Sequence, residues 1–211
     1  MHIPDGFLSP PVFISGWLAA VASLSYALKK TKQTLKDKMV PLMGVMAAFI
    51  FASQMLNFPI LGGTSGHLLG GVLASVTVGP YAACVILTLV LAVQCFIFQD
   101  GGLTALGANI FNMAVVGTVF SYCLYLVLKK LLGAKRKLLA VFIRSWCSVV
   151  MAASFCALEL ALSGTSPLTI VLPAMVFVHI FIGISEAVIT ALIVGFLLQV
   201  RPDLIYNDSN A

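Results

Sequence analysis

Long apolar stretches joined by short polar connections run through the whole of this 211-residue chain. Hydrophobic residues make up 61% of the sequence and charged residues only 9%, whereas a soluble domain carries about 25% charge. An α-helix needs about 20 apolar residues to cross the hydrocarbon core of a bilayer. Composition and run length therefore predict one all-α integral membrane domain over 1–211, with no separate soluble domain.

Seven apolar runs are candidates for membrane-spanning helices. The third is short, contains glycine and ends at Gly79-Pro80, a pair typical of turns, so a re-entrant element is the alternative to a full span there. With all seven counted, the expected spans are about 7–28, 39–60, 68–79, 80–98, 104–128, 138–163 and 168–200.

The basic residues predict the orientation of these spans. They follow the first, fifth and seventh runs, while the connections around 58–67, 99–104 and 163–168 contain no Lys or Arg. Cytoplasmic loops are enriched in Lys and Arg, so seven spans with the N-terminus outside and the C-terminus inside fit the pattern, and six spans break it. Topology also explains the net charge of +5, which does not indicate nucleic-acid binding. The residues concerned are Lys29, Lys30, Lys32, Lys36, Lys38, Lys129, Lys130, Lys135, Arg136, Lys137 and Arg201.

The first residues of the chain form a potential metal chelate. The α-amino group of Met1, the amide nitrogen of His2 and the His2 imidazole can close fused five- and six-membered rings around one ion. Taken alone, a second-position histidine is more typical of a solvated tail. Residues 1–12 contain no Lys or Arg, so a cleaved signal peptide is not expected, and Met1 is expected to remain as the outward-facing N-terminus.

A fourth nitrogen is available from His67, which ends the loop Gly62-Gly63-Thr64-Ser65-Gly66-His67. The predicted orientation places His67 and His2 on the same outer face of the membrane. A planar set of four nitrogens suits Ni(II) or Cu(II) better than Zn(II), which prefers a tetrahedron. The sequence thus predicts a metal site built from Met1, His2 and His67, with donors that suit Ni²⁺ or Cu²⁺.

Ionisable residues inside the runs are further candidates, because burying them in a membrane is costly. His179 and Glu186 are seven residues apart and share a helix face, which favours either a polar spine that orients the metal-site loops or an interhelical clamp without a transport role. His179 as a direct ligand is a further alternative. Arg144 is expected to anchor its helix at the cytoplasmic interface. Asp5, Ser65, Asn109 and Asn112 complete the predicted surroundings of the site.

Several other patterns do not support chemistry of their own. The glycine-rich segments lack the Lys-Ser/Thr ending of a P-loop, so the chain is not expected to hydrolyse a nucleotide or to be an enzyme. Asn207-Asp208-Ser209 matches a glycosylation triplet but falls on the predicted cytoplasmic side. Small residues recur every fourth position in two runs, a pattern that permits close helix packing within the bundle or against a membrane partner. These candidates for partner docking are Ser15, Ala19, Ser23, Gly44, Ala48 and Ala52.

Four segments together resemble the CbiM/NikM family, the substrate-binding S components of energy-coupling-factor (ECF) cobalt and nickel importers. They are Met1-His2-Ile3-Pro4-Asp5-Gly6-Phe7-Leu8, the loop from Asn57-Phe58-Pro59 to Gly66-His67-Leu68, the stretch from Asp100 to Asn109, and the stretch from His179 to Glu186. The resemblance covers essentially the whole chain.

The family resemblance implies six core helices plus an additional N-terminal helix in the cell membrane. It implies metal ligation by the Met1 amine, the His2 amide and ring, and the His67 ring. The transported ligand is then expected to be Ni²⁺ or Co²⁺, with Cu²⁺ as a competitor and no organic cofactor. It also implies three kinds of partner: a transmembrane coupling (T) component, a pair of ATP-binding subunits and often a small accessory membrane subunit. The alternatives are a stand-alone divalent-metal carrier or channel, and a membrane-embedded metal-dependent enzyme using His179 and Glu186.

Overall fold

The computed structural model describes residues 1–35, 37, 39–60 and 64–206. Lys36 and Lys38, the Gly62-Gly63 start of the His67 loop and the triplet Asn207-Asp208-Ser209 lie outside the described residues.

Within those residues, five helices are long and apolar enough to cross a membrane, and the chain is a multi-pass membrane protein. The helix over Leu106–Leu132 is continuous but not uniform, because α5 (Leu106–Asn109) passes into a π-helical stretch, η1 (Ile110–Phe120), and then into α6 (Ser121–Leu132). The other four are α1 (Pro10–Thr34), α4 (Pro80–Phe98), α7 (Lys137–Leu162) and α8 (Leu168–Val200).

The second and third apolar runs differ from the expected spans. The helix α2 (Met39–Gln54) is shorter than the predicted 39–60, and the loop after it is a hairpin. Its strands β1 (Asn57–Ile60) and β2 (Thr64–His67) are antiparallel, with Asn57 opposite His67. A strand forms here because Asn57, Pro59 and the polar Thr-Ser-Gly stretch interrupt the helical hydrophobic pattern.

The third run contains only the helix α3 (Gly71–Val78), and all eight of its residues are buried. Eight residues make a helix of about 12 Å, against the roughly 30 Å of hydrocarbon, so α3 does not cross by its own length. Gly79 then turns the chain into α4 with a φ of 88°, a left-handed conformation that glycine adopts without strain. The all-α class is therefore confirmed, with a small hairpin added, while seven spans and the orientation stay predictions.

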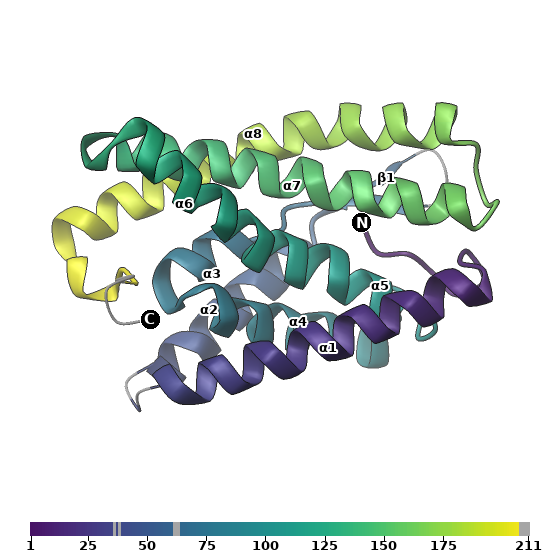
Figure 1. Cartoon of the computed structure of the whole chain (residues 1–211), viewed down its shortest axis with the longest axis horizontal. Coiled ribbons are helices and arrows are strands. Elements are labelled where there is room, and N and C mark those ends of the chain that lie inside the picture. Colours follow the sequence, from purple (N-terminus) through teal and green to yellow (C-terminus); the bar gives the residue numbers. More distant parts are fainter. Residues whose placement is uncertain (36, 38, 61–63, 207–211) are drawn as a thin grey trace.

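Figure 1 shows α7 and α8 side by side along one edge of the bundle and α1 along the opposite edge, with α3 enclosed between them. The N-terminal segment runs from the start of α1 back into the bundle, and residue 1 lies among the helices and not at their surface. Two glycines let α1 approach the Leu106–Leu132 helix closely: a Cβ on Gly107 would collide with Trp17, and one on Gly16 would collide with Ala108.

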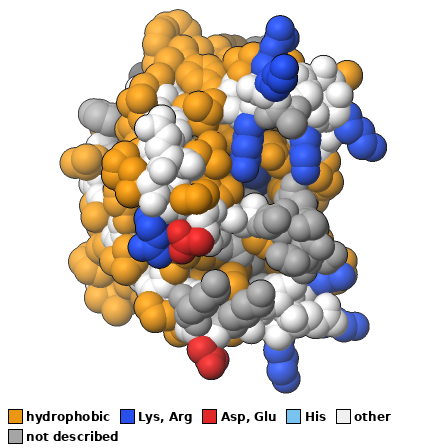
Figure 2. Space-filling model, turned by 90° about the vertical axis from the view of Figure 1, so that its left-hand side faces the viewer, with side chains coloured by type: hydrophobic (Ala, Val, Ile, Leu, Met, Phe, Trp, Pro, Cys, Tyr) orange, Lys and Arg blue, Asp and Glu red, His pale blue; other side chains and the backbone are white. Residues whose placement is uncertain are grey.

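The basic side chains gather at the end of the bundle opposite the N-terminus (Figure 2). The helix α7 connects the two ends, since it begins at Lys137 and its Cys156 thiol lies 3.9 Å from the Met1 carbonyl oxygen. The fold thus separates a basic end from the end that holds Met1 and His2, which is the arrangement that the positive-inside rule favours.

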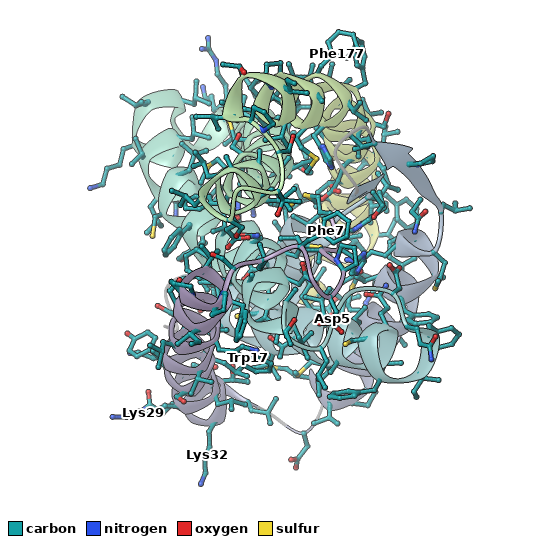
Figure 3. All side chains as sticks on the ribbon, turned by 90° about the vertical axis from the view of Figure 1, so that its right-hand side faces the viewer. Asp5, Phe7, Trp17, Lys29, Lys32 and Phe177 are labelled. Carbon is teal, nitrogen blue, oxygen red and sulfur yellow. The ribbon has the colours of Figure 1, made fainter. Side chains whose placement is uncertain are left out.

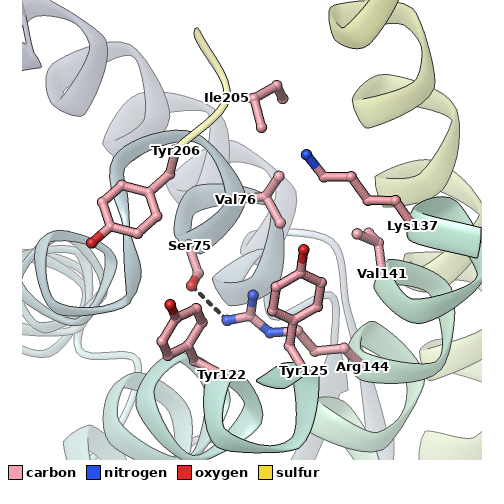
Figure 4. A pocket seen from close by; sticks show the side chains of 9 residues that line it. All are labelled: Ser75, Val76, Tyr122, Tyr125, Lys137, Val141, Arg144, Ile205 and Tyr206. Carbon is pink, nitrogen blue, oxygen red and sulfur yellow. Dashed lines mark hydrogen bonds between the residues drawn. The ribbon is translucent and has the colours of Figure 1, made fainter. Parts of the chain in front are cut away.

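Arg144 does not occupy the interfacial position expected for it, because its side chain is buried, with 1% exposure. Its guanidinium donates to the hydroxyl of Ser75 and lies over the rings of Tyr122 and Tyr125 (Figure 4). It also donates to the Ser121 hydroxyl and to the Thr118 carbonyl. Hydrogen bonds and ring faces inside the bundle replace the water that an interfacial position would have supplied.

The structure also separates the two stripes of small residues. The α2 stripe of Gly44, Ala48 and Ala52 is exposed along its whole length, and a Cβ on Gly44 would meet nothing within 4 Å. In the α1 stripe, Ser15 is exposed while Ala19 and Ser23 are half-buried. The α2 stripe therefore faces outward from the bundle, a point that the sequence left open.

Candidate metal centre

The first three residues form a buried plug at the end of the bundle, with exposures of 0%, 4% and 0% for Met1, His2 and Ile3. Ile3 is held on both sides of its backbone: its N–H donates to the Asn109 carbonyl oxygen at 2.9 Å, and its carbonyl accepts from the Asn109 amide at 3.1 Å. The N–H of Gly102 donates to the same Ile3 carbonyl at 2.8 Å. Asn109 therefore positions the N-terminal segment beside the site and does not point into it.

Asp5 fixes the next turn of this segment. Its carboxylate accepts hydrogen bonds from the N–H of Leu103 at 3.0 Å, the N–H of Thr104 at 2.7 Å and the Thr104 hydroxyl. The Thr104 hydroxyl is the main cause that lowers the pKa of Asp5 from its usual value, so the carboxylate is ionised at neutral pH. In Figure 3, which looks onto the right-hand end of Figure 1, Asp5 and Phe7 lie near the middle of that end, where the segment crosses it.

The α-amino group of Met1 lies against β2. It donates to the carbonyl oxygen of Ser65 and, at 3.1 Å, to the Ser65 hydroxyl. Burial lowers the pKa of this amine from 8.0 to about 5. The amine is therefore neutral at pH 7, and a neutral amine nitrogen has the lone pair that a metal ion needs.

The rings of His2 and His67 meet across 65 residues of sequence, with centroids 4.6 Å apart and planes at 31°. Burial is the main cause that lowers the pKa of His2 to about 3 and that of His67 well below 6.5, so both imidazoles are neutral.

Hydrogen bonds select the tautomer of each ring. A carbonyl oxygen can only accept, so His2 Nε2 must donate to Gln94 Oε1 at 3.0 Å, and His67 Nδ1 must donate to the Leu68 carbonyl at 2.9 Å. The lone pairs are then left on His2 Nδ1, the nitrogen that closes the six-membered chelate ring, and on His67 Nε2. The His67 Nε2 atom is buried and has no hydrogen-bond partner among the described residues. Metal-binding histidines typically donate their second ring nitrogen in this way.

The helix α8 supports the segment that follows His67. The Glu186 carboxylate accepts hydrogen bonds from the N–H of Leu69 and, at 3.0 Å, from the N–H of Gly70, just before α3 begins. The Gln54 amide donates to the Leu69 carbonyl at 2.9 Å. Glu186 thus lies where it could orient the loop that carries His67, the role predicted for it.

His179 lies on the same face of α8, near β2. A Cβ on Gly66 would collide with Ile182, three residues after His179 in α8, and would touch Val178, the residue just before it. His179 Nδ1 donates to the Met175 carbonyl at 2.7 Å, and its Nε2 is buried without a hydrogen-bond partner in the described part of the chain. Asn112 lies apart from these residues and donates to the Glu159 carboxylate at 2.6 Å, so its polar group is used between helices.

No group of three His, Cys, Asp or Glu side chains that could hold a metal ion occurs among the described residues. A nitrogen-rich site at the buried N-terminus must therefore use main-chain nitrogens in addition to His2 and His67. Sequence reasoning missed Gln54 and Gln94, because nothing in their local sequence distinguishes them from ordinary helix residues. Their partners Leu69 and His2 lie 15 and 92 residues away along the chain.

The fold and site define a class: a multi-pass membrane protein in which a buried N-terminal amine lies beside two neutral imidazoles. Comparison with known proteins agrees with that class. Residues 2–204 match the family CbiM, described as "Cobalt uptake substrate-specific transmembrane region". The chain belongs to this family.

Two relatives and one solved structure illustrate the family. An Archaeoglobus fulgidus protein named "Putative fused nickel transport protein NikMN" is 39% identical over 207 residues, covering 97% of this chain and 68% of the relative. The "Fused nickel transport protein NikMN" of Rhodobacter capsulatus is 34% identical over 221 residues, covering 97% of this chain and 64% of the relative. A crystal structure described as a truncated transition metal transporter is 39% identical, with a TM-score of 0.87 over 94% of this chain and 99% of that one. The chain is thus a cobalt/nickel transport component of the CbiM/NikM type, and its named relatives are transport proteins.

Proposed function

We propose that this chain is the substrate-binding S component of an ECF-type importer and that it captures Ni²⁺ or Co²⁺ at the extracellular side. The ion is held by four nitrogens: the Met1 amine, the His2 amide, His2 Nδ1 and His67 Nε2. The observation that carries the proposal is the contact of two neutral imidazoles, 4.6 Å apart, beside an amine that burial keeps neutral at pH 7. Both ring tautomers leave a lone pair on the nitrogen that the chelate requires.

Selectivity follows from the donor set. Mg²⁺ and Ca²⁺ prefer oxygen ligands, and Zn²⁺ prefers a tetrahedron, whereas a planar nitrogen set that includes a deprotonated amide suits Ni(II). Cu²⁺ suits the same nitrogen set, so the low availability of free Cu²⁺, and not the donor geometry, must limit its uptake. Nickel and cobalt both remain candidates for the physiological ion, in line with the two metals named for the family and its relatives.

Energy is supplied by partner subunits in this proposal. The sequence contains no P-loop, so ATP hydrolysis is assigned to a pair of ATP-binding subunits. A T component, with a small accessory membrane subunit, completes the complex that releases the ion. The fused NikMN relatives are longer than this chain, which leaves room in them for a further part. The exposed small-residue stripe of α2 is the face offered to the T component, since small residues allow close helix approach in a membrane.

The proposal is tested by replacing His2 or His67 with Ala in protein purified with its native Met1. Each replacement removes one imidazole donor and leaves the other proposed nitrogen donors in place. We expect Ni²⁺ and Co²⁺ binding, measured by calorimetry, to collapse in His2→Ala and in His67→Ala. Gln33→Ala, at an exposed position near the end of α1, is the control and should bind normally. Normal binding by His2→Ala or by His67→Ala would place the site elsewhere.

Liposomes that contain this chain alone separate the S component from a stand-alone carrier. The S component should bind the ion without sustained uptake, whereas a carrier should accumulate it.

A further inference from the structure

Asp100 occupies an unusual turn next to the candidate site. It follows Gln99, whose φ of 55° makes it the one non-glycine residue with positive φ among those described, and it precedes Gly101, with φ of 95°. The N–H of Asp100 donates to the Gln94 carbonyl at 3.0 Å, and the Gln94 side chain accepts the hydrogen bond that sets the His2 tautomer. Left-handed backbone at a non-glycine residue is unfavourable and tends to occur at functional sites. Here it directs Asp100 back toward the N-terminal plug.

The Asp100 carboxylate faces the chelating groups. Its Oδ1 lies 3.5 Å from His2 Nδ1, the ring nitrogen that the chelate uses. Its second oxygen, Oδ2, is buried and has no hydrogen-bond partner among the described residues. A buried carboxylate oxygen without a partner is unusual and calls for a physical explanation.

The exposure of these side chains decreases inward. The Asp100 side chain is 20% exposed and that of His2 only 3% exposed, while Met1 is completely buried. Asp100 is therefore the group that an ion arriving from solvent meets before it reaches His2.

Charge supplies the physical reason for a carboxylate here. A divalent ion bound by a neutral amine, two neutral imidazoles and one deprotonated amide leaves a net charge of +1 in a buried site. Burying an uncompensated charge is strongly unfavourable. One ionised carboxylate beside the chelate makes the loaded site neutral, and Asp100 is the carboxylate that the structure places there.

We propose that Asp100 is a working part of the metal centre: its carboxylate captures the hydrated divalent cation at the mouth of the site and balances its charge once the nitrogens have closed around it. This inference rests on the proposed function. It adds the Asp100 carboxylate to a site whose other groups are nitrogens, and it assigns that carboxylate to the first capture of the ion.

A merely structural role makes the opposite prediction. If Asp100 only paired with a protonated N-terminus or His2 in the empty protein, it would compete with the metal. Removing its charge would then leave the metal affinity unchanged or raise it. The sign of the change in affinity thus separates the two roles.

The test compares Asp100→Asn with wild-type protein carrying its native Met1. Ni²⁺ affinity is measured by calorimetry, and the association rate by stopped-flow mixing at low and high salt. We expect Asp100→Asn to bind about tenfold or more weakly, the size typical for groups that support metal ligands. Its association rate should be lower and should lose most of its salt dependence, since salt screens charge–charge attraction. Asp203→Asn at the basic end changes the net charge equally and should bind as the wild type does.

Asp100→Glu keeps the charge and guards against a folding defect in the first variant. It should retain the fast, salt-dependent association and lose only part of the affinity. Equal or tighter binding by Asp100→Asn, in protein with an unchanged unfolding temperature, would overturn the inference. Failure of the proposed function looks different, because the wild type itself would then bind no Ni²⁺, or would bind it independently of His67.

Discussion

Gly102 provides a test of the site that changes none of its ligands. A Cβ at this position would collide with the Asp5 backbone nitrogen, the Asp5 carboxylate and the Pro4 carbonyl carbon. Most of these atoms belong to the backbone of the N-terminal segment, which cannot rotate out of the way. Gly102→Ala should therefore push the segment outward and unseat Met1 and His2.

The expected size follows from the packing. Adding a methyl group to a well-packed region typically costs about 1–3 kcal/mol, and about 1.4 kcal/mol corresponds to a tenfold change in an equilibrium constant. Because the segment must be seated for the metal to bind, this cost appears in the apparent affinity. We expect Ni²⁺ binding to weaken between about 5-fold and about 150-fold.

Calorimetric titration of Ni²⁺ into the purified variant measures this loss. Gly44→Ala is the matched control, because its Cβ would meet nothing within 4 Å and it lies in α2, away from the plug. Proteolysis of the N-terminal segment should also be faster in Gly102→Ala than in the control. Wild-type affinity in Gly102→Ala would refute the argument that this turn seats the chelate.

Two further predictions concern protons and α8. Burial lowers the pKa of the Met1 amine to about 5, so protons compete with the metal for this amine only below that pH. Between about pH 7.5 and 5.5, metal binding displaces only the one amide proton, and Ni²⁺ affinity should fall about tenfold for each unit that the pH is lowered. The fall should steepen below about pH 5, and a slope of about a hundredfold per unit already at neutral pH would mean that the amine keeps its ordinary pKa. Glu186→Gln removes the charge that holds the N–H groups of Leu69 and Gly70, a contribution of about 1.5–3 kcal/mol for bonds to a charged group. The unfolding temperature should drop, with a smaller loss of affinity, while Ser185→Ala at an exposed position of the same helix should change neither. An unchanged unfolding temperature in Glu186→Gln would contradict the orienting role.

The sequence by itself determined the class of the protein and the chemistry of its N-terminus. Hydrophobicity is a property of each local stretch, so apolar runs predict membrane helices wherever they are long enough, as at 80–98 and 168–200. The chelate of Met1 and His2 is equally local, because its rings close through bonds between adjacent residues. The role of His67 could be predicted only as far as topology allowed, by placing it on the same face of the membrane.

The tertiary structure decided what depends on groups that are distant along the chain. Nothing in the local sequence of Gln94 indicates that it selects the His2 tautomer, and nothing around Gly102 shows that the Asp5 backbone passes within contact. The buried position of Arg144 depended on hydroxyls and rings supplied by other segments. The sequence showed that the third apolar run is short, but only the structure showed that its helix α3 has eight residues, all of them buried. Hydropathy reports the environment of a segment, whereas hydrogen-bond partners and close contacts arise only when the chain has folded.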